Sequence, residues 1–350
     1  MNIFSKVKSS VVLNKNNTLQ AKVRISGTGH YVPTDLRASS DIDQELGRKS
    51  GKTEQRTGVY SRPVANQESS SSMAVAAALR ALKDADMEAS QIDLILSACA
   101  VPEQPIPAMA PLIQAGLGLS QSGIPAFDVN ASCLSFVAGF DFAAQLIEAQ
   151  RYKNVLIVSS EIASRALPWS TDPDTAAMFG DGAAAVIISP SQRDGAGLVA
   201  SHMETWSEGY RDCELPSGGT RFDFHKQQDA FASGAAFRMD GRAAYKLAAK
   251  VIRPFMDKLL AKAGWTLDDV DIVVPHQASR GALDHLVAKL KIPRAKIIDI
   301  IANHGNQIAA SIPTALSIAM HDGRIKSGMK VLVIGTSAGF SVGGLCLVIE

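Results

Sequence analysis

The sequence has few cysteines, no excess of charge of either sign and no long apolar run. Its 350 residues include four cysteines, and 35 basic residues nearly balance 34 acidic ones to give a net charge of +1. This balance lacks the basic footprint of a nucleic-acid-binding protein, so no nucleic-acid partner is expected. No stretch reaches the ~18 to 20 apolar residues of a membrane span, so membrane insertion is not expected either.

The cysteines are too far apart to act as a local motif. Cys99, Cys133, Cys213 and Cys346 form no CxxC pair and have no metal-ligand spacing. This pattern favours a reduced, cytoplasmic protein without a metal site. Residues 1–22 contain several Ser, Asn and Lys residues but no apolar core of a signal peptide, and we interpret them as an N-terminal extension.

One cysteine has an informative setting, in the stretch FDVNASCLSFVAGF. Residues 127–129 are typical of the end of a buried strand, and residues 134–149 have the apolar spacing of a helix. Cys133 then lies near a helix N-terminus, where the helix dipole favours a nucleophilic thiolate. The alternative is a buried structural cysteine, because free cysteine is among the most buried residue types.

Two segments of the chain occur again later in similar form. ALKDADMEASQIDLILSA (81–98) aligns without a gap to LLAKAGWTLDDVDIVVPH (259–276) at an offset of 271 − 93 = 178, and KNVLIVSS (153–160) aligns to MKVLVIGT (329–336) at 331 − 155 = 176. Matching order and similar offsets indicate an internal duplication. Each half alternates strands and helices, which predicts mostly parallel sheets covered by helices. Residues 23–26 are predicted as the first strand, with a turn at Gly27–Gly29.

The duplication brings other polar residues into consideration. His276 follows the strand 272–274, and Asn306 lies in NHGNQ, the second-half counterpart of the Cys133 loop. In open α/β sheets such carboxyl-end loops carry the site. The alternatives are a structural histidine and a helix N-cap asparagine. The segment GTSAGFSVGG (335–344) can present backbone N–H groups to an oxyanion, or it is a plain hairpin.

At this point the sequence resembles a known family. The blocks ISGTGHYVP, RTGV, FDVNASC, MFGDGAAAV, FRMDGRAAYKLA, VPHQAS, HGNQIAASIPTAL and DGRIKSG are together similar to thiolase-fold condensing enzymes, and among them to β-ketoacyl-acyl-carrier-protein synthase III. The resemblance implies a thiolase fold, in which duplicated βαβαβαββ halves, here residues 23–195 and 196–350, form a five-layer αβαβα sandwich.

The resemblance also implies a mechanism. Cys133, His276 and Asn306 match the catalytic triad, and Cys133 and Ala338 match the backbone N–H groups of the oxyanion site. Cys133 is then acylated by a thioester, and a malonyl-type thioester on acyl carrier protein loses CO2 and condenses with the acyl group, in fatty acid initiation or specialised metabolism. Neither a metal nor a redox cofactor is implied; acyl-CoA or acyl carrier protein supplies the acyl group.

Further positions follow from the same resemblance. Substrate-binding positions are matched by Arg56, Ile106, Ser279, Thr336 and Gly339. Ile106 matches a residue that reaches the partner's acyl pocket, which implies a homodimer. A basic cluster after His276, including Arg280 and Lys289, could dock an acidic carrier protein, although a solvated helix face explains it equally well.

Several positions depart from the family pattern. Lys52 and Pro173 replace the tryptophan and arginine that clamp the adenine of coenzyme A, Ser279 replaces an asparagine, and Thr336 an aromatic residue. Loss of the clamp removes a stacking and cation–π contribution of about 1 to 3 kcal/mol. We therefore expect a specialised enzyme whose donor is an unusual acyl-CoA or a carrier protein.

Two other functional classes compete with condensation. An acyltransferase or thioesterase could use Cys133 without forming a carbon–carbon bond, but such chemistry does not need the enolate-stabilising pair His276 and Asn306. A non-catalytic partner of another ketosynthase predicts an eroded triad, and this sequence retains all three members. Decarboxylative condensation is therefore favoured.

Overall fold

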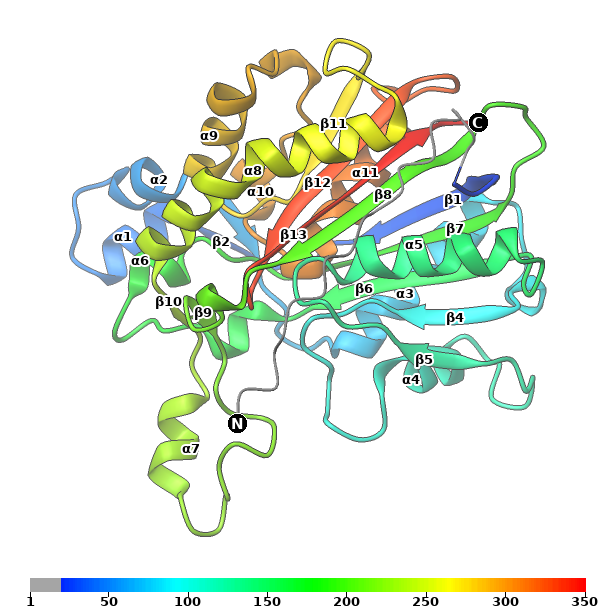
Figure 1. Cartoon of the computed structure of the whole chain (residues 1–350). Helices are drawn as coiled ribbons and strands as arrows, with labels where there is room; N and C mark the ends of the chain where they lie inside the picture. The colour runs from blue at the N-terminus through cyan, green and yellow to red at the C-terminus, as the bar shows by residue number, and fades with distance from the viewer. Residues whose placement is uncertain (1–19) are drawn as a thin grey trace, which may run out of the picture.

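The computed structural model describes residues 20–350, so residues 1–19 of the predicted extension lie outside the described residues. Two β-sheets form the centre of the molecule, with helices between them and on both outer sides (Figure 1). Ala21 already belongs to the packed body, because it is fully buried and forms an antiparallel bridge with Leu198.

The first sheet combines parallel and antiparallel strands in the order β1-β7-β6-β4-β5. β4 is parallel to β5 and β6, whereas β7 is antiparallel to β1 and β6. The strands are β1 (Val23–Tyr31), β4 (Leu94–Ser97), β5 (Ala126–Asp128), β6 (Val155–Glu161) and β7 (Gly182–Pro190). The prediction that residues 127–129 end a buried strand is wrong for the edge strand β5, since the side chain of Phe127 is 37% exposed.

The second sheet repeats this arrangement in the order β11-β12-β13-β8, with β11 parallel to β12 and the other neighbours antiparallel. The prediction of mostly parallel sheets is therefore wrong. Its strands are β8 (Gly197–Thr205), β11 (Ile272–Pro275), β12 (Lys330–Ser337) and β13 (Ser341–Val348). β4 and β11 begin 272 − 94 = 178 residues apart, the offset of the sequence repeat. The counterpart of β5 is reduced to a parallel bridge between Val273 and Ile297. Pro293 lies four residues before this bridge and has no N–H with which to extend the strand pairing.

The helices form the remaining layers. α3 (Ser70–Asp84) and α4 (Met109–Gly116) cover the outer face of the first sheet, α5 (Ser135–Glu148) and α11 (Ser311–His321) lie between the sheets, and α8 (Gly241–Ala263) and α9 (Arg280–Leu290) cover the second sheet. Strand side chains alternate accordingly, with Leu94 and Leu96 in the central core and Ile95 in the outer one. The predicted five-layer αβαβα sandwich is confirmed.

Short elements surround the layers. They are β2 (Leu36–Ala38), α1 (Ser39–Glu45), α2 (Lys52–Thr57), β3 (Ser61–Pro63), α6 (Pro173–Ala176), β9 (Cys213–Glu214), α7 (Gln228–Gly234), β10 (Arg238–Met239) and α10 (Ile301–His304). β9 and β10 pair, and the chain between them, including α7, extends away from the body (Figure 1).

The turn predicted at Gly27–Gly29 is wrong, because both glycines lie within β1. A Cβ atom at Gly27 would lie 2.4 Å from the carbonyl oxygen of Ala81, and one at Gly29 would lie 2.4 Å from that of Ala77. The glycines therefore serve close packing of β1 against α3 and not chain reversal.

Candidate active site

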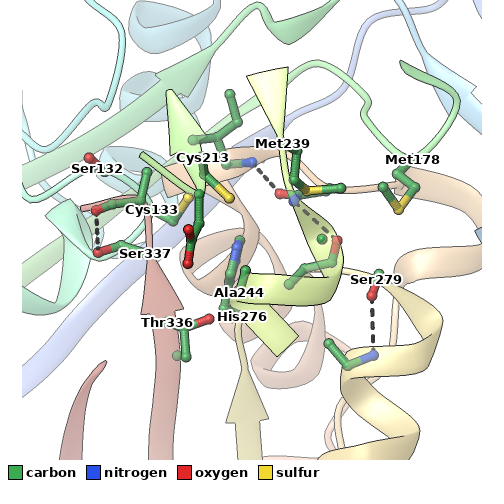
Figure 2. Close-up of a pocket in the computed structure, with 18 of the residues that line it drawn as sticks. Ser132, Cys133, Met178, Cys213, Met239, Ala244, His276, Ser279, Thr336 and Ser337 are labelled. Carbon is green, nitrogen blue, oxygen red and sulfur yellow. Dashed lines mark hydrogen bonds between the residues drawn. The ribbon is translucent and has the colours of Figure 1, made fainter. Parts of the chain in front are cut away.

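A cavity of about 650 Å³ lies at the carboxyl ends of the central strands. Figure 2 shows Cys133, His276, Ser279 and Thr336 around this space. The lining also contains the predicted residues Asn306, Ala338 and Gly339. Seven residues selected from separate parts of the sequence therefore line one cavity, although their roles remain predictions.

A tight turn between β5 and α5 positions Cys133. Ser132 adopts a left-handed backbone conformation with a φ of 54°, and its N–H donates to Asn130 Oδ1 at 2.9 Å. The Ser135 hydroxyl donates to the Ser132 carbonyl oxygen at 2.6 Å and accepts from the Ala131 N–H at 2.9 Å. α5 begins at Ser135, so Cys133 lies just before the helix, as the sequence predicts.

The ionisation of Cys133 differs from the expectation of a helix-stabilised thiolate. Burial raises the pKa of the thiol to about 12, and the hydrogen bond from the Ala338 N–H opposes this shift only in part. Removal from water is the largest cause of this shift. The resting side chain is a neutral thiol.

The hairpin between β12 and β13 brings the Ala338 N–H to this thiol. Ser337 pairs with Ser341 across the hairpin, which leaves residues 338–340 as the turn. Gly339 has a φ of 81°, a conformation that glycine adopts without a steric penalty. The segment is thus a hairpin, and it also directs a backbone donor into the cavity, so the two interpretations of 335–344 do not exclude each other.

His276 directly follows β11 and continues its pairing with β12, since its N–H donates to the Ile334 carbonyl oxygen at 2.8 Å. Burial lowers the pKa of His276 to about 4, so the imidazole is neutral at pH 7. Nδ1 is buried without a hydrogen-bond partner among the described residues. A Cβ atom at position 335 would lie 2.8 Å from the His276 Cβ, so a glycine is needed at this position for the His276 side chain to fit.

Asn306 is fixed from several sides. Its backbone N–H donates to Met178 O at 2.8 Å, and its side-chain Nδ2 donates to Ala278 O at 3.2 Å. Its Oδ1 accepts from the Ile308 N–H at 2.9 Å. The N-cap interpretation of Asn306 is wrong, because the N-cap of the following short helix is Gln307 and the Oδ1 bond closes a turn just before it. The second Nδ2 hydrogen is not used by these bonds.

Two predicted substrate-binding residues lie outside the cavity lining. Arg56, at the end of α2, forms an ion pair with Asp174, which also pairs with Arg48 at 2.6 Å. Ile106, between β4 and α4, is 87% exposed. The cavity of a single chain thus does not contain either side chain, and a substrate contact of Ile106 requires a second subunit.

The predicted docking residues lie on α9, beside the cavity. Arg280 is half-buried and pairs with Asp299, which also accepts from Arg294. Lys289 is exposed in the last turn of the helix. Part of the positive charge of this cluster is therefore neutralised within the chain, and Lys289 is the more accessible candidate.

Two residues near the thiol were not selected from the sequence. Cys213 in β9 lines the same cavity, and Glu161 ends β6 with its side chain fully buried. Backbone N–H groups of Ala100 and Val101 donate to the Glu161 carboxyl group. A carboxyl group at the end of the otherwise uncharged run VLIVSSE was the signal that could have identified Glu161.

Glu161 is expected to make stability fall as pH rises. Burial raises its pKa from 4.5 to about 8, so between these values the folded protein binds more protons than the unfolded chain. The contribution of Glu161 to the free energy of unfolding is fully present below pH 4.5 and is lost as pH rises through 8. For a pKa shift of this size the loss is about 5 kcal/mol. Urea denaturation of wild type and Glu161→Gln across this range should show the variant losing less stability with rising pH; a constant difference contradicts the assignment.

Neither a metal cluster nor a membrane span appears in residues 20–350. No group of three or more His, Cys, Asp or Glu side chains there could hold a metal ion. Within the same residues, no helix combines the length and the apolar character needed to cross a membrane.

Duplicated sheets with a thiol, an imidazole and a carboxamide around one cavity define the class of thiolase-fold condensing enzymes. The family model of 3-oxoacyl-[acyl-carrier-protein] synthase III matches residues 127–207, and the model of its C-terminal region matches residues 260–349. The chain belongs to the 3-oxoacyl-[acyl-carrier-protein] synthase III family, and it is an acyltransferase.

Individual relatives match over nearly the whole chain. The β-ketoacyl-[acyl-carrier-protein] synthase III of Neisseria gonorrhoeae (strain NCCP11945) is 34% identical over 326 residues, which cover 93% of this chain and 98% of the relative. The crystal structure of FabH from Pseudomonas aeruginosa PAO1 superposes with a TM-score of 0.84 at 29% identity, over 95% of this chain and 99% of that chain. OleA from Xanthomonas campestris, at 24% identity and a TM-score of 0.82 over 94% and 99%, shares the fold.

Proposed function

We propose that the enzyme transfers an acyl group from a thioester to Cys133 and condenses it with a malonyl-type thioester on acyl carrier protein. In the first step the Cys133 sulfur attacks the thioester carbonyl, and the proton of its thiol leaves with the released thiol. The observation that carries the proposal is the shared cavity of Cys133, His276 and Asn306. The family membership of the chain supports the same reaction type.

Backbone donors are well placed for the charge that develops during acyl transfer. The Ala338 N–H faces the Cys133 sulfur closely enough to lower the pKa of the thiol, so it lies beside the reacting group. We propose that it and the Cys133 N–H bind the carbonyl oxygen as it becomes an oxyanion. Rigid donors of this kind need no reorganisation when the charge appears.

His276 and Asn306 are suited to the second step. A neutral imidazole and a carboxamide can each donate one hydrogen bond to the malonyl thioester carbonyl. Loss of CO2 then leaves an enolate whose oxygen carries more charge than the carbonyl did, so both bonds strengthen. The enolate carbon attacks the acyl group on Cys133, a carbon–carbon bond forms and the carbon–sulfur bond to Cys133 breaks. The thiolate released with the β-ketoacyl product takes up one proton from solvent and becomes the resting thiol again.

The test is intact-protein mass spectrometry of the wild type with a panel of acyl-CoAs and acyl carrier proteins, followed by malonyl carrier protein. We expect a mass gain that the chase removes together with formation of a β-ketoacyl product. An adduct that malonyl carrier protein cannot discharge indicates the acyltransferase or thioesterase alternative. Absence of any adduct contradicts the nucleophile assignment.

The donor is proposed to be held without an adenine clamp. Lys52 begins α2 and Pro173 begins α6, and the neighbouring Asp174 joins these helices by pairing with Arg48 and Arg56. This carboxylate engages the cations that could otherwise contact a nucleotide. The arrangement supports a donor that is recognised through its acyl group and thioester arm.

Comparison of acetyl-CoA with acetyl-pantetheine measures how much the adenine nucleotide contributes to donor binding. We expect KM values that agree within about threefold, because the contribution of about 1 to 3 kcal/mol from adenine stacking is missing. The measurement is the rate of Cys133 acylation as a function of donor concentration. A KM at least tenfold lower for the CoA form contradicts this proposal.

We also propose a homodimer in a reducing, cytoplasmic setting. Phe127 on edge strand β5 and Phe142 on α5 are 37% and 42% exposed and pack edge to face, with ring centroids 6.1 Å apart. These rings and the exposed Ile106 are apolar surface that a second subunit could cover. All four cysteines are free thiols, which supports a reducing compartment.

A further inference from the structure

The cavity extends well beyond the predicted triad, into a space between α8 and α9. Ala244, Ala248 and Ile252 recur at every fourth residue of α8 and line it from one side. Leu283 and Leu286 of α9 line it from the other. Figure 2 labels Ala244 among the residues that line the cavity. The small alanine side chains leave room for a ligand, and the wall is largely apolar.

One polar pair interrupts this apolar wall. The Tyr245 hydroxyl on α8 and the His285 Nδ1 on α9 are 2.7 Å apart, and the two rings pack edge to face at a centroid distance of 4.7 Å. Both residues line the cavity. Tyr245 is half-exposed, so the pair lies where the cavity approaches solvent.

The other ring nitrogen of His285 has no partner. Nε2 is buried and makes no hydrogen bond among the described residues. An imidazole nitrogen is the better acceptor and a phenol the better donor, so the Tyr245 O–H donates to Nδ1. The proton of the neutral ring is then on Nε2, which becomes a buried donor without an acceptor. Such a group costs stability unless a ligand satisfies it.

His285 lies farther along α9 than the cavity residue Ser279. It is six residues beyond Ser279, the N-cap of α9, which corresponds to about 9 Å along the helix at 1.5 Å per residue. None of the hydrogen bonds of His285 involves Cys133, His276 or Asn306 among the described residues. A role in orienting another part of the substrate therefore fits this position.

We propose that the Tyr245–His285 pair is a substrate-recognition site at which His285 Nε2–H donates to a carbonyl oxygen remote from the reacting thioester. This inference rests on the proposed acylation of Cys133. The oxygen has two possible sources with the same chemistry, an oxo group on the acyl chain or an amide carbonyl of the thioester arm. Tyr245 acts as the positioning residue that sets the tautomer of His285.

The experiment uses matched thioesters that differ in one carbonyl. One comparison pairs a 3-oxoacyl or more remote oxoacyl thioester with the unsubstituted chain of equal length; the other pairs acyl-pantetheine with a simple alkyl thioester of the same acyl group. The readout is kcat/KM for Cys133 acylation, by intact mass. We expect the wild type to prefer one carbonyl-containing partner about tenfold, and the pair that shows the preference identifies the source of the oxygen.

Variants separate recognition from folding. His285→Ala should reduce the preference ratio toward one, His285→Gln should restore part of it through its amide N–H, and Tyr245→Phe should reduce it because Nδ1 loses its partner. Ala288→Ser, an exposed position on the same helix, is the matched control. A preference ratio that is the same in wild type and His285→Ala, or close to one for both pairs in the wild type, overturns the inference. Failure of every thioester to acylate Cys133 overturns the proposed function, and the inference with it.

Discussion

Replacing Cys133 by alanine is expected to abolish the acyl adduct and to lower condensation by about 10⁴-fold or more, because the proposed acyl intermediate is carried by the Cys133 sulfur. The same variant should still release CO2 from malonyl carrier protein. His276 lies at the end of β11 and Asn306 in the turn after α10, and none of the hydrogen bonds that hold the His276 backbone or the Asn306 backbone and side chain involves Cys133. Intact mass and CO2 release measure the two steps separately.

The second thiol in the cavity provides the control for this result. Cys213 lines the same space and is also a free cysteine, and burial raises its pKa to about 11. Cys213→Ala should still form the adduct, and peptide mapping of the wild type should place the acyl group on Cys133. An adduct that persists in Cys133→Ala but disappears in Cys213→Ala assigns the nucleophile to the other sulfur.

Asn306→Ala is expected to retain the acylation step and to lose the decarboxylation step, which is the reverse of the result expected for Cys133→Ala. Acylation of Cys133 should persist, because Asn306 has no role in that step, whereas decarboxylation should fall by about 10²- to 10³-fold, the usual loss for one oxyanion donor. His276→Ala should cause a loss of similar size in the second step. Single-turnover discharge of the preformed acyl enzyme by malonyl carrier protein measures both variants. Discharge at the wild-type rate in either variant contradicts the assigned role.

The pH dependence of the discharge step tests the state of His276. Its pKa is lowered from 6.5 to about 4, so the ring stays neutral as pH falls through 6.5. The pH profile of the wild-type discharge rate should therefore have no inflection near pH 6.5 that depends on the histidine. Wild type and His276→Ala should give profiles of the same shape in this range. An inflection there, present only with the histidine, indicates that the ring is protonated near neutral pH and donates as a cation.

Sequence and structure contribute different parts of this account. The internal repeat at an offset of 178 anticipated the equivalence of β4 and β11, because a strand and its preceding helix retain their apolar spacing through a duplication. Cys133 was recognisable from the strand and helix around it. The turn predicted at Gly27–Gly29 failed because the same glycines also permit the contact of β1 with α3, and a local pattern cannot distinguish the two uses.

The sequence by itself determined the order of the elements, the duplicated organisation and the placement of the Cys133 thiol and the His276 imidazole after strands. The carboxamide of Asn306 instead follows the short helix α10. Only the tertiary structure decided their ionisation, since the pKa values of Cys133, Glu161 and His276 depend on how far folding removes each group from water. It also decided pairings between distant parts of the chain. Tyr245 and His285 are 40 residues apart, and Arg56 and Asp174 are 118 apart. Such contacts depend on how the layers pack, and no local periodicity records that packing.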